Sequence, residues 1–418
     1  MGISLTSEYA KARPSNDVNF LRSKMATDAI AIHGKEKVVN GTIGAIHDDD
    51  GELVFLKTVE EAFLNLPRNE YAAYAPVPGL PAYLEKVVDE CFGQSKPAGY
   101  IKAIATPGGT GVVHHLIHNY TEIGDEVLTS DWRWAIYDIL SEDNRRRLRT
   151  FELFTDALTF NREAFGAAVK DVAGTQRNVV VILNSPAHNP TGFSLTDEDW
   201  DAVLSILSDI AENGRNNVIL EVDAAYLDYA GPKEETRRFF GKFSNLPERL
   251  LVIIGYSMSK AYTVYGQRMG AMIAVSSNED VIREFENVNA RTSRATWSNT
   301  SRPTMMTMVA LASSSEKQAA YEAERNSYYE LIKRRAEIFV REAESCGLPM
   351  LPYCAGFFIA LPCDDPTALC DALAEELVFL VPLEKGVRIA ICGIPTAQVE
   401  GLAVRISDAA KRIANGNE

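Results

Sequence analysis

A lysine that follows an apolar run is the strongest candidate for chemistry in this sequence. Lys260 ends the Ser-x-Ser-Lys stretch 257–260 directly after the apolar run 250–255, and Arg268 stands eight residues later. In open α/β sheets, reactive groups collect at the carboxyl ends of strands. A lysine there is poorly solvated, which lowers its pKa and provides a neutral amine that can form an imine. Ser257 and Arg268 could bind an anion beside it, although a surface lysine is an equally good interpretation of Lys260 alone.

Two further polar positions follow apolar runs. Asp223 ends the run 218–222, and Asn189 opens the Asn-Pro-Thr-Gly turn that comes after the run 179–183. A carboxylate at the end of a buried strand is costly without a cationic partner, and a protonated pyridine nitrogen would be such a partner. Tyr226 and Asn189 could both hydrogen-bond a phenolic oxygen of the same ring. A helix-capping aspartate and an ordinary turn are the commoner interpretations of these residues taken singly.

A glycine-rich loop offers an anion site. Residues 108–111, Gly-Gly-Thr-Gly, follow the apolar run 101–105 and precede the predicted helix 112–120. Glycines let backbone amides approach an anion, and a helix N-terminus adds its dipole. The loop lacks both the Gly-x-Gly-x-x-Gly spacing and the Lys-Ser/Thr ending of a P-loop, so the signal is weak by itself. The following His114, His115 and His118 lack the glutamate of a His-Glu-x-x-His motif, and we assign no metal site.

The elements that must position these side chains alternate between strands and helices. Apolar, β-branched runs are typical of strands buried on both faces of a parallel sheet, and they cover residues 101–105, 126–129, 178–183, 218–222, 250–255 and 270–275. Between them lie amphipathic helices, one of which begins at a capping pair formed by Thr196 and Asp199. This order predicts an α/β fold with a large domain, in which helices cover both faces of a mostly parallel sheet.

The chain changes character from about residue 313. A long charged helix is predicted over 314–344, shorter strands follow at 356–361 and 386–391, and a last helix ends the chain. This order is typical of a smaller α+β domain. At 418 residues the chain exceeds the size at which a single hydrophobic core is common. We therefore predict two domains.

Composition argues against several classes of function. The 42 basic and 57 acidic residues give a net charge of −15, which argues against binding to nucleic acid. No apolar run is long enough to cross a bilayer, so we predict no membrane association. The six cysteines form no Cys-x-x-Cys pair and are typical of free thiols in a reducing compartment. We therefore predict a cytoplasmic location.

Taken together, the motifs resemble the aspartate and aromatic amino acid aminotransferases of the fold-type I pyridoxal-phosphate group, over about residues 40–391. The resemblance implies pyridoxal 5'-phosphate bound to Lys260 as a Schiff base, with Lys260 also moving the substrate's proton. It implies the remaining cofactor contacts at matching positions: Asp223 at the ring nitrogen, Tyr226 and Asn189 at the phenolic oxygen, Trp132 stacked on the ring, and Gly109, Thr110, Ser257 and Arg268 at the phosphate.

The same resemblance implies a homodimer with shared active sites. Tyr74 matches the tyrosine that reaches the phosphate of the neighbouring subunit, and Arg294 matches the arginine that crosses the dimer to a distal substrate carboxylate, with Arg291 and Arg302 as nearby alternatives. Arg388 matches the arginine that binds the substrate α-carboxylate. Gly44 lies in the segment that closes over the substrate. The implied domains are a large cofactor-binding domain, 54–312, and a small domain made from 1–53 and 313–418.

One stretch departs from the family pattern. The family commonly has Pro-Asn-His after the stacking tryptophan, and the histidine supports the aspartate from behind. Here Arg133-Trp134-Ala135 follows Trp132. Trp134 and Trp297 add aromatic bulk near the expected pocket, which leaves aromatic amino acids open beside aspartate.

We therefore predict an aminotransferase that exchanges the amino group between an amino acid, aspartate or aromatic, and 2-oxoglutarate. A lyase or decarboxylase would use the same scaffold and differ in the bond broken. A nicotinamide-dependent dehydrogenase would need an acidic residue about twenty positions after the glycine loop; Asp125 and Asp131 are in range, but the loop spacing is wrong. A non-catalytic pyridoxal-phosphate-binding protein is a further alternative.

Overall fold

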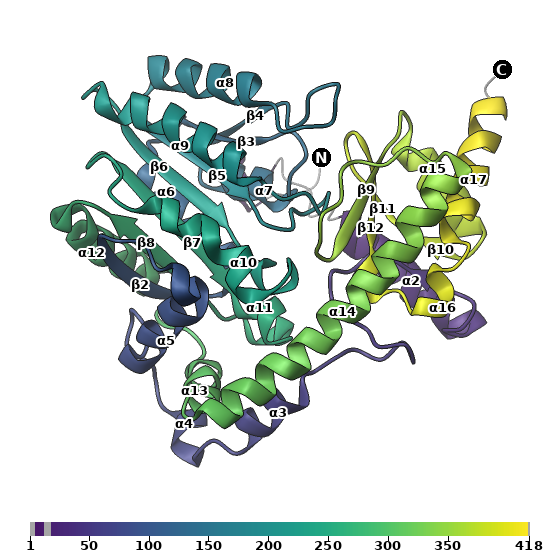
Figure 1. Ribbon diagram of the computed structural model, residues 1–418, viewed down its shortest axis with the longest axis horizontal. Helices are drawn as coiled ribbons and strands as arrows, with labels where there is room; N and C mark the ends of the chain where they lie inside the picture. The colour runs from purple at the N-terminus through teal and green to yellow at the C-terminus, as the bar shows by residue number, and fades with distance from the viewer. Residues whose placement is uncertain (1–4, 12–17, 417–418) are drawn as a thin grey trace.

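The computed structural model describes residues 5–11 and 18–416, arranged as two layered regions joined by one long helix (Figure 1). The larger region surrounds a seven-stranded sheet and the smaller one a three-stranded sheet. Residues 1–4, 12–17 and 417–418 of the predicted small domain lie outside the described residues. The domain boundaries at residues 54 and 312 stay predictions. Within the described residues, no helix combines the length and the apolar character needed to cross a bilayer.

The large sheet is mostly parallel, as predicted. Its spatial order is β2-β8-β7-β6-β5-β3-β4, and β8 runs antiparallel to both of its neighbours while the other neighbouring pairs are parallel. Every residue of β7 and β8 is buried, which explains the continuous apolar runs. The strands are β2 (Tyr100–Thr106), β3 (Glu126–Ser130), β4 (Arg147–Phe151), β5 (Asn178–Asn184), β6 (Asn217–Asp223), β7 (Leu250–Ser257) and β8 (Gly270–Ser276).

Helices cover both faces of this sheet, because successive strand residues point to opposite sides. In β6, Leu220 and Val222 join one core together with Trp200 of α9. Ile219 joins a second core, together with Val112 of α6. The helices of the larger region include α5 (Pro81–Phe92), α6 (Gly108–Tyr120), α7 (Ile136–Asp143), α8 (Arg162–Thr175), α9 (Asp197–Glu212), α10 (Lys233–Arg237), α11 (Met258–Ala261) and α12 (Glu279–Thr296).

The smaller region contains segments from both ends of the chain. Its sheet has the order β11-β12-β9 and is antiparallel; β9 is Phe358–Pro362, β11 Val381–Pro382 and β12 Gly386–Ala390. The N-terminal strand β1 (Val39–Asn40) pairs in parallel with β10 (Val378–Phe379). Helices α2 (Val18–His33) and α15 (Pro366–Glu375) pack on these strands. Helix α17 (Leu402–Gly416) packs on α15, and the short α16 (Thr396–Val399) lies against α17.

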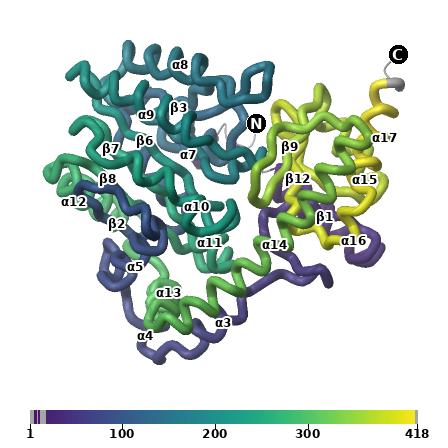
Figure 2. The backbone as a smooth tube through the Cα atoms, viewed as in Figure 1, coloured from purple at the N-terminus to yellow at the C-terminus, as the bar shows by residue number. Residues whose placement is uncertain are grey.

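Helix α14 (Ser315–Cys346) contacts both regions (Figure 2). One end packs on α3 (Lys57–Leu64) and α13 (Arg302–Leu311), and the other packs on α16 and α17. Two buried arginines of α14 bind it to the two regions, one to each. Arg325 Nη1 lies 2.9 Å from the Asp228 carboxylate, and Arg335 Nη1 donates to the carbonyl oxygen of Cys392 at 2.9 Å. Two short helices, α1 (Glu8–Lys11) and α4 (Arg68–Ala72), complete the set.

Two boundaries differ from the sequence prediction. By sequence the run 145–147 is typical of a solvated helix face, but strand β4 begins at Arg147, because Arg147 pairs with Glu126 of β3 and Arg149 forms ion pairs with Glu126 and Asp171. An edge strand has one side in solvent, so it tolerates these charges. Helix α6 begins at Gly108 rather than 112. The glycine-rich loop is therefore the first turn of the helix.

Candidate active site

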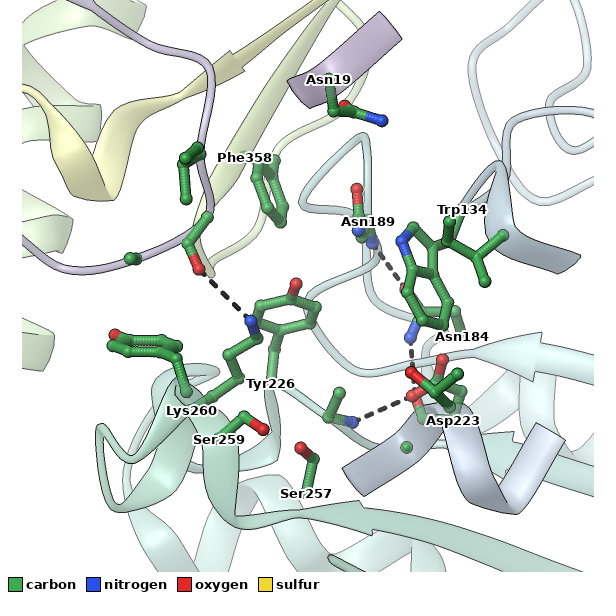
Figure 3. Close-up of a pocket in the computed structure, with 18 of the residues that line it drawn as sticks. Asn19, Trp134, Asn184, Asn189, Asp223, Tyr226, Ser257, Ser259, Lys260 and Phe358 are labelled. Atoms are coloured by element: carbon green, nitrogen blue, oxygen red, sulfur yellow. Dashed lines mark hydrogen bonds between the residues drawn. The ribbon is translucent and has the colours of Figure 1, made fainter. Parts of the chain in front are cut away.

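A cavity of about 330 Å³ lies at the carboxyl ends of three parallel strands (Figure 3). Asn184, Asp223 and Ser257, the last residues of β5, β6 and β7, all line it. The smaller region contributes Phe358 and Arg388 to the opposite wall. The cavity therefore lies between the two regions, at the sheet edge where polar side chains were expected.

Lys260 lies on the cavity wall, in α11 immediately after β7. Its Nζ donates to the carbonyl oxygen of Gly44 at 3.3 Å (Figure 3) and lies 5.1 Å from the centroid of the Tyr265 ring. Burial lowers the pKa of Lys260 to about 8, and the nearby guanidinium groups of Arg268 and Arg388 act in the same direction. At pH 7 roughly one tenth of such a group is neutral, so the amine is available as a nucleophile or base.

Asp223 is buried at the end of β6 and faces the cavity. Its Oδ2 accepts a hydrogen bond of 2.5 Å from the Tyr137 hydroxyl, and its Oδ1 accepts one of 3.2 Å from the Ala225 N–H. Burial raises the pKa of Asp223, while the Tyr137 hydrogen bond and the Lys260 charge oppose this rise. A cation brought to the open side of this carboxylate would complete its neutralisation.

The turn after β5 is tied to the end of β6. Asn184 Nδ2 donates to the carbonyl oxygen of Asp223 at 2.7 Å, and Asn184 Oδ1 accepts from the N–H of Asn189 at 2.6 Å (Figure 3). Asn189 and Tyr226 both line the cavity, as expected. The Tyr226 ring packs edge-on against Phe358 with a centroid distance of 5.5 Å. Asn184 was not predicted as a site residue.

Arg268 and the first turn of α6 lie together on the cavity wall. Arg268 Nη1 donates to Ser259 Oγ at 3.1 Å, and its Nη2 donates to Thr110 Oγ1 at 3.4 Å. Gly108 permits this approach, since a methyl group there would lie 2.8 Å from Arg268 Nη2. Gly109 and Thr110 line the cavity in the first turn of the helix, whose N–H groups have no acceptor within the helix. Ser257 and Ser259, the two serines of the Ser-x-Ser-Lys stretch, line the same wall.

Arg388 extends from β12 across the cavity. Its Nη2 donates to the carbonyl oxygen of Thr42 at 2.9 Å and to Asn19 Oδ1 at 2.8 Å, and its Nη1 donates to Asn189 Oδ1 at 3.4 Å. The guanidinium carbon lies 4.6 Å from the centroid of the Phe358 ring. The side chain is thus held in one orientation by both regions. Asn19, from α2, is a site residue that no sequence motif marked.

The tryptophan on the cavity wall is Trp134 and not Trp132, the residue that the family resemblance implied. Asp131 Oδ1 accepts from the N–H of Trp132 at 2.8 Å, and this turn directs Trp132 into the neighbouring cleft, where its ring lies over Gly386. Tyr137 follows Trp134 by three positions, the spacing at which the family's histidine follows its tryptophan. The three-residue spacing from Trp134 is therefore the sequence signal that a tyrosine, Tyr137, stands in place of the histidine.

Trp297 and the three histidines lie together outside the cavity lining. The Trp297 ring stacks on His115 at 4.4 Å, and His114 stacks on His118 at 5.6 Å. Throughout residues 5–11 and 18–416, no group of three histidine, cysteine or acidic side chains is placed to hold a metal ion. The two residues expected to act across a dimer, Tyr74 and Arg294, also lie outside this cavity.

Tyr74 is 88% exposed, and Arg294 is exposed and donates to Ser298 Oγ. The alternative Arg302 forms an ion pair with Glu70 at 2.7 Å. Among the described residues that line the cavity, the cationic side chains are those of Lys260, Arg268 and Arg388.

The sequence of this chain also matches the model of a known family. The model of the family described as aminotransferase class I and II matches residues 36–406. The chain belongs to this family. Its membership confirms the resemblance drawn from the motifs, the predicted fold class and pyridoxal 5'-phosphate as the cofactor.

Individual relatives of this chain are also named as aminotransferases. The aromatic-amino-acid aminotransferase of Escherichia coli is 27% identical over 247 residues, which cover 56% of this chain and 58% of that enzyme. The chain thus spans less than two thirds of this curated relative. The aspartate aminotransferase of Pseudomonas aeruginosa is 24% identical over 320 residues, covering 74% of this chain and 77% of that enzyme.

Among solved structures, an aminotransferase from Anaerococcus prevotii has a TM-score of 0.95 and 37% identity, covering 98% of this chain and 100% of that one. An aromatic-amino-acid aminotransferase from Burkholderia pseudomallei covalently bound to pyridoxal phosphate has a TM-score of 0.78 at 22% identity, covering 97% and 100% of the two chains. The second likeness supports the fold.

Proposed function

We propose that this chain is a pyridoxal-phosphate-dependent aminotransferase that exchanges the amino group between an amino acid and 2-oxoglutarate. The observation that carries the proposal is Lys260, an amine with a pKa of about 8, placed between a buried carboxylate and two arginines. Its nearest hydrogen-bond acceptor, the Gly44 carbonyl, is uncharged. Nothing in the family comparison favours the lyase, decarboxylase or dehydrogenase alternatives.

The residues present fit this cofactor. Asp223 would hold a protonated ring nitrogen, since it is buried and has Tyr137 and Ala225 on its far side. Arg268 and Thr110, with the first turn of α6, would hold the phosphate. When bound, pyridoxal phosphate supplies a conjugated ring that accepts electrons from the carbon losing a proton.

The chain's own groups then orient the substrate and move its proton. Arg388, which donates to Asn189 Oδ1, would bind the α-carboxylate and thereby hold the Cα–H bond toward Lys260. Lys260 would accept that proton at Nζ as the general base and, as the general acid, donate it to the cofactor's aldehyde carbon. Trp134, which lines the cavity, would cover one face of a bound ring and exclude water from it.

We further propose that both dicarboxylic and aromatic amino acids are substrates. Apolar side chains on the described cavity wall support the aromatic class, namely Phe20, Ile43, Trp134, Ile136 and Phe358. Arg268 and Arg388 already have assigned anions. A distal carboxylate therefore needs a further cation, and Arg294 from a second copy of the chain is the proposed source.

A homodimer with shared sites follows from this assignment. It is supported by the exposure of Tyr74 and Arg294 outside their own chain's cavity. Mixing tests it directly: Lys260→Ala and Arg294→Ala proteins should each be inactive with aspartate, and refolding them together should restore activity. A mixture with no activity above that of the two proteins alone would contradict shared sites. A cytoplasmic location stays a prediction.

The reaction is tested by absorption spectroscopy of the purified holoenzyme. The bound cofactor's absorption should bleach when an amino donor is added and return when 2-oxoglutarate is added. Aspartate, glutamate and the aromatic amino acids form the donor series. Lys260→Ala should abolish turnover, and near-normal activity of that variant would overturn the proposal, as would release of carbon dioxide in place of a keto acid.

A further inference from the structure

A second carboxyl group lies one step deeper in the sheet than Asp223. Glu221 precedes Asp223 by two positions in β6, so both side chains point to the same face. Glu221 is fully buried, and neither of its carboxyl oxygens has a hydrogen-bond partner among the described residues. An isolated buried carboxylate is costly enough that the group normally takes up a proton instead. Neither the cofactor contacts nor the substrate contacts proposed above use Glu221.

The neighbouring strands accommodate this side chain. Gly255 of β7 pairs with Asp223, and a methyl group at Gly255 would lie 2.9 Å from Glu221 Oε1 and 3.5 Å from Val112. Directly beside Glu221 in the sheet are Ile182 of β5 and Ile253 of β7. The surroundings are thus apolar, and the space for the carboxyl group exists because residue 255 has no side chain.

The two carboxyl groups differ in the donors available to them. Asp223 accepts hydrogen bonds from the Tyr137 hydroxyl and the Ala225 N–H, which stabilise its charged form. Glu221 has no such donor, and two like charges in one buried site oppose each other. Burial raises the pKa of Glu221 well above its usual value, and the charge of Asp223 adds to the rise. Both effects place the proton on Glu221.

Tyr137 completes the arrangement. Burial raises its pKa well above the usual tyrosine value, and the charge of Asp223 adds to the rise. The phenol therefore remains a neutral donor, whereas a histidine in its place could become charged. Because Tyr137 stays neutral, the charge of the site depends only on the protons that Glu221 and Asp223 bind.

We propose that Glu221 is a positioning residue for the ring-nitrogen site: it stays protonated, so that Glu221 and Asp223 together carry one negative charge, which Tyr137 holds on Asp223. The inference rests on the proposed role of Asp223 toward the cofactor ring. The pair presents a single full charge to the ring nitrogen and keeps its one proton on a group that the cofactor does not touch.

Infrared spectroscopy tests the protonation directly. Holoenzyme at neutral pH, labelled with ¹³C at glutamate side-chain carboxyls, should show a protonated carboxylic-acid band in the labelled-minus-unlabelled difference spectrum. Glu221→Gln should lack this band. Glu163→Gln, at an exposed position of α8, is the matched control and should keep it. Absence of the band from the wild type, or its survival in Glu221→Gln, would overturn the proposal, and the wild-type spectrum decides even where the variant fails to fold.

The bound cofactor provides a second readout. Glu221→Gln replaces a neutral acid by a neutral amide, so the pH midpoint of the cofactor's absorption should shift by less than about 0.3 units, whereas loss of an ionised glutamate would shift it by about one unit or more. Tyr137→Phe should weaken cofactor binding about tenfold because it removes the donor from Asp223. A midpoint shift of a unit in Glu221→Gln contradicts the inference.

If the role proposed for Asp223 toward the cofactor ring is wrong, the two readouts give a different combination of results. If Asp223→Ala bound the cofactor as the wild type does, the role of Asp223 would be lost while the glutamic-acid band remained. In that case Glu221 would be a buried acid without a function in the site, and the proposal would fall for that reason.

Discussion

Asn19 of α2 accepts a hydrogen bond of 2.8 Å from Nη2 of Arg388. Through Asn19, helix α2 reaches the cavity wall (Figure 3). The same nitrogen of Arg388 also donates to the carbonyl oxygen of Thr42. The fork of an arginine is the group that binds a carboxylate in two places. Asn19 therefore shares the group to which we assign the substrate carboxylate.

We expect Asn19→Asp to raise KM for both the amino donor and the 2-oxo acid by about tenfold, which corresponds to about 1.4 kcal/mol. The introduced carboxylate would compete with the substrate for Arg388, while the cofactor contacts stay unchanged. Steady-state kinetics at several donor concentrations measures this. Asn19→Ala is the matched control and should change KM less than threefold; an aspartate variant with wild-type KM would contradict the placement.

Loading of the cofactor should depend on pH through Lys260. The neutral amine is the attacking form, and the pKa of Lys260 is lowered to about 8 by burial. Below that pH the rate of uptake by the apoprotein should rise about tenfold per pH unit, and above it the rate should level off. Stopped-flow absorption on apoprotein follows this step. A rate that keeps rising toward pH 10 would mean that the pKa is not lowered.

The two neighbouring tryptophans should have separable effects. Trp134→Ala should weaken cofactor binding and shift its absorption, because it removes the ring from the cavity wall. Trp132 is 8% exposed, and truncation of a buried tryptophan costs about 3–5 kcal/mol of stability. Urea unfolding and cofactor titration on both variants distinguish these effects. If Trp132→Ala weakened cofactor binding and Trp134→Ala instead lowered stability, Trp132 would be the residue that stacks on the cofactor ring.

Gly44 is expected to tolerate no side chain. A methyl group there would lie 2.4 Å from Cζ of Phe358, which packs on Arg388 and Tyr226. Gly44→Ala should therefore displace Phe358 and raise KM about tenfold or more. Adding Phe358→Leu to Gly44→Ala should give less than the sum of the two separate effects, because the clash is then relieved. Strict additivity in kinetic measurements would count against this contact.

The sheet and the residues at its strand ends could be predicted because both depend on local pattern. Continuous apolar runs gave the strands, and Asp223 and Lys260 follow such runs directly. The position of each residue on the cavity wall then followed from the parallel order of the strands.

The remaining site residues depend on contacts that no local pattern encodes. Trp132 and Trp134 are two positions apart, and only the turn at Asp131 decides which one faces the cavity. Asn19 reaches Arg388 across 369 positions of sequence, so no spacing marks it. Glu221 lies inside an otherwise apolar strand, and its lack of a partner becomes visible only when the neighbouring strands are in place.

The two arginines of α14 have a mechanical consequence. Arg325 is anchored to Asp228 beside the large sheet, and Arg335 is anchored to the backbone of His47 and Cys392 in the smaller region. Ten residues of continuous helix, about 15 Å, separate the two anchors. Any rotation that widens the cavity must therefore bend this helix between them or break one anchor. We therefore expect the bending stiffness of this continuous helix to resist opening of the cavity.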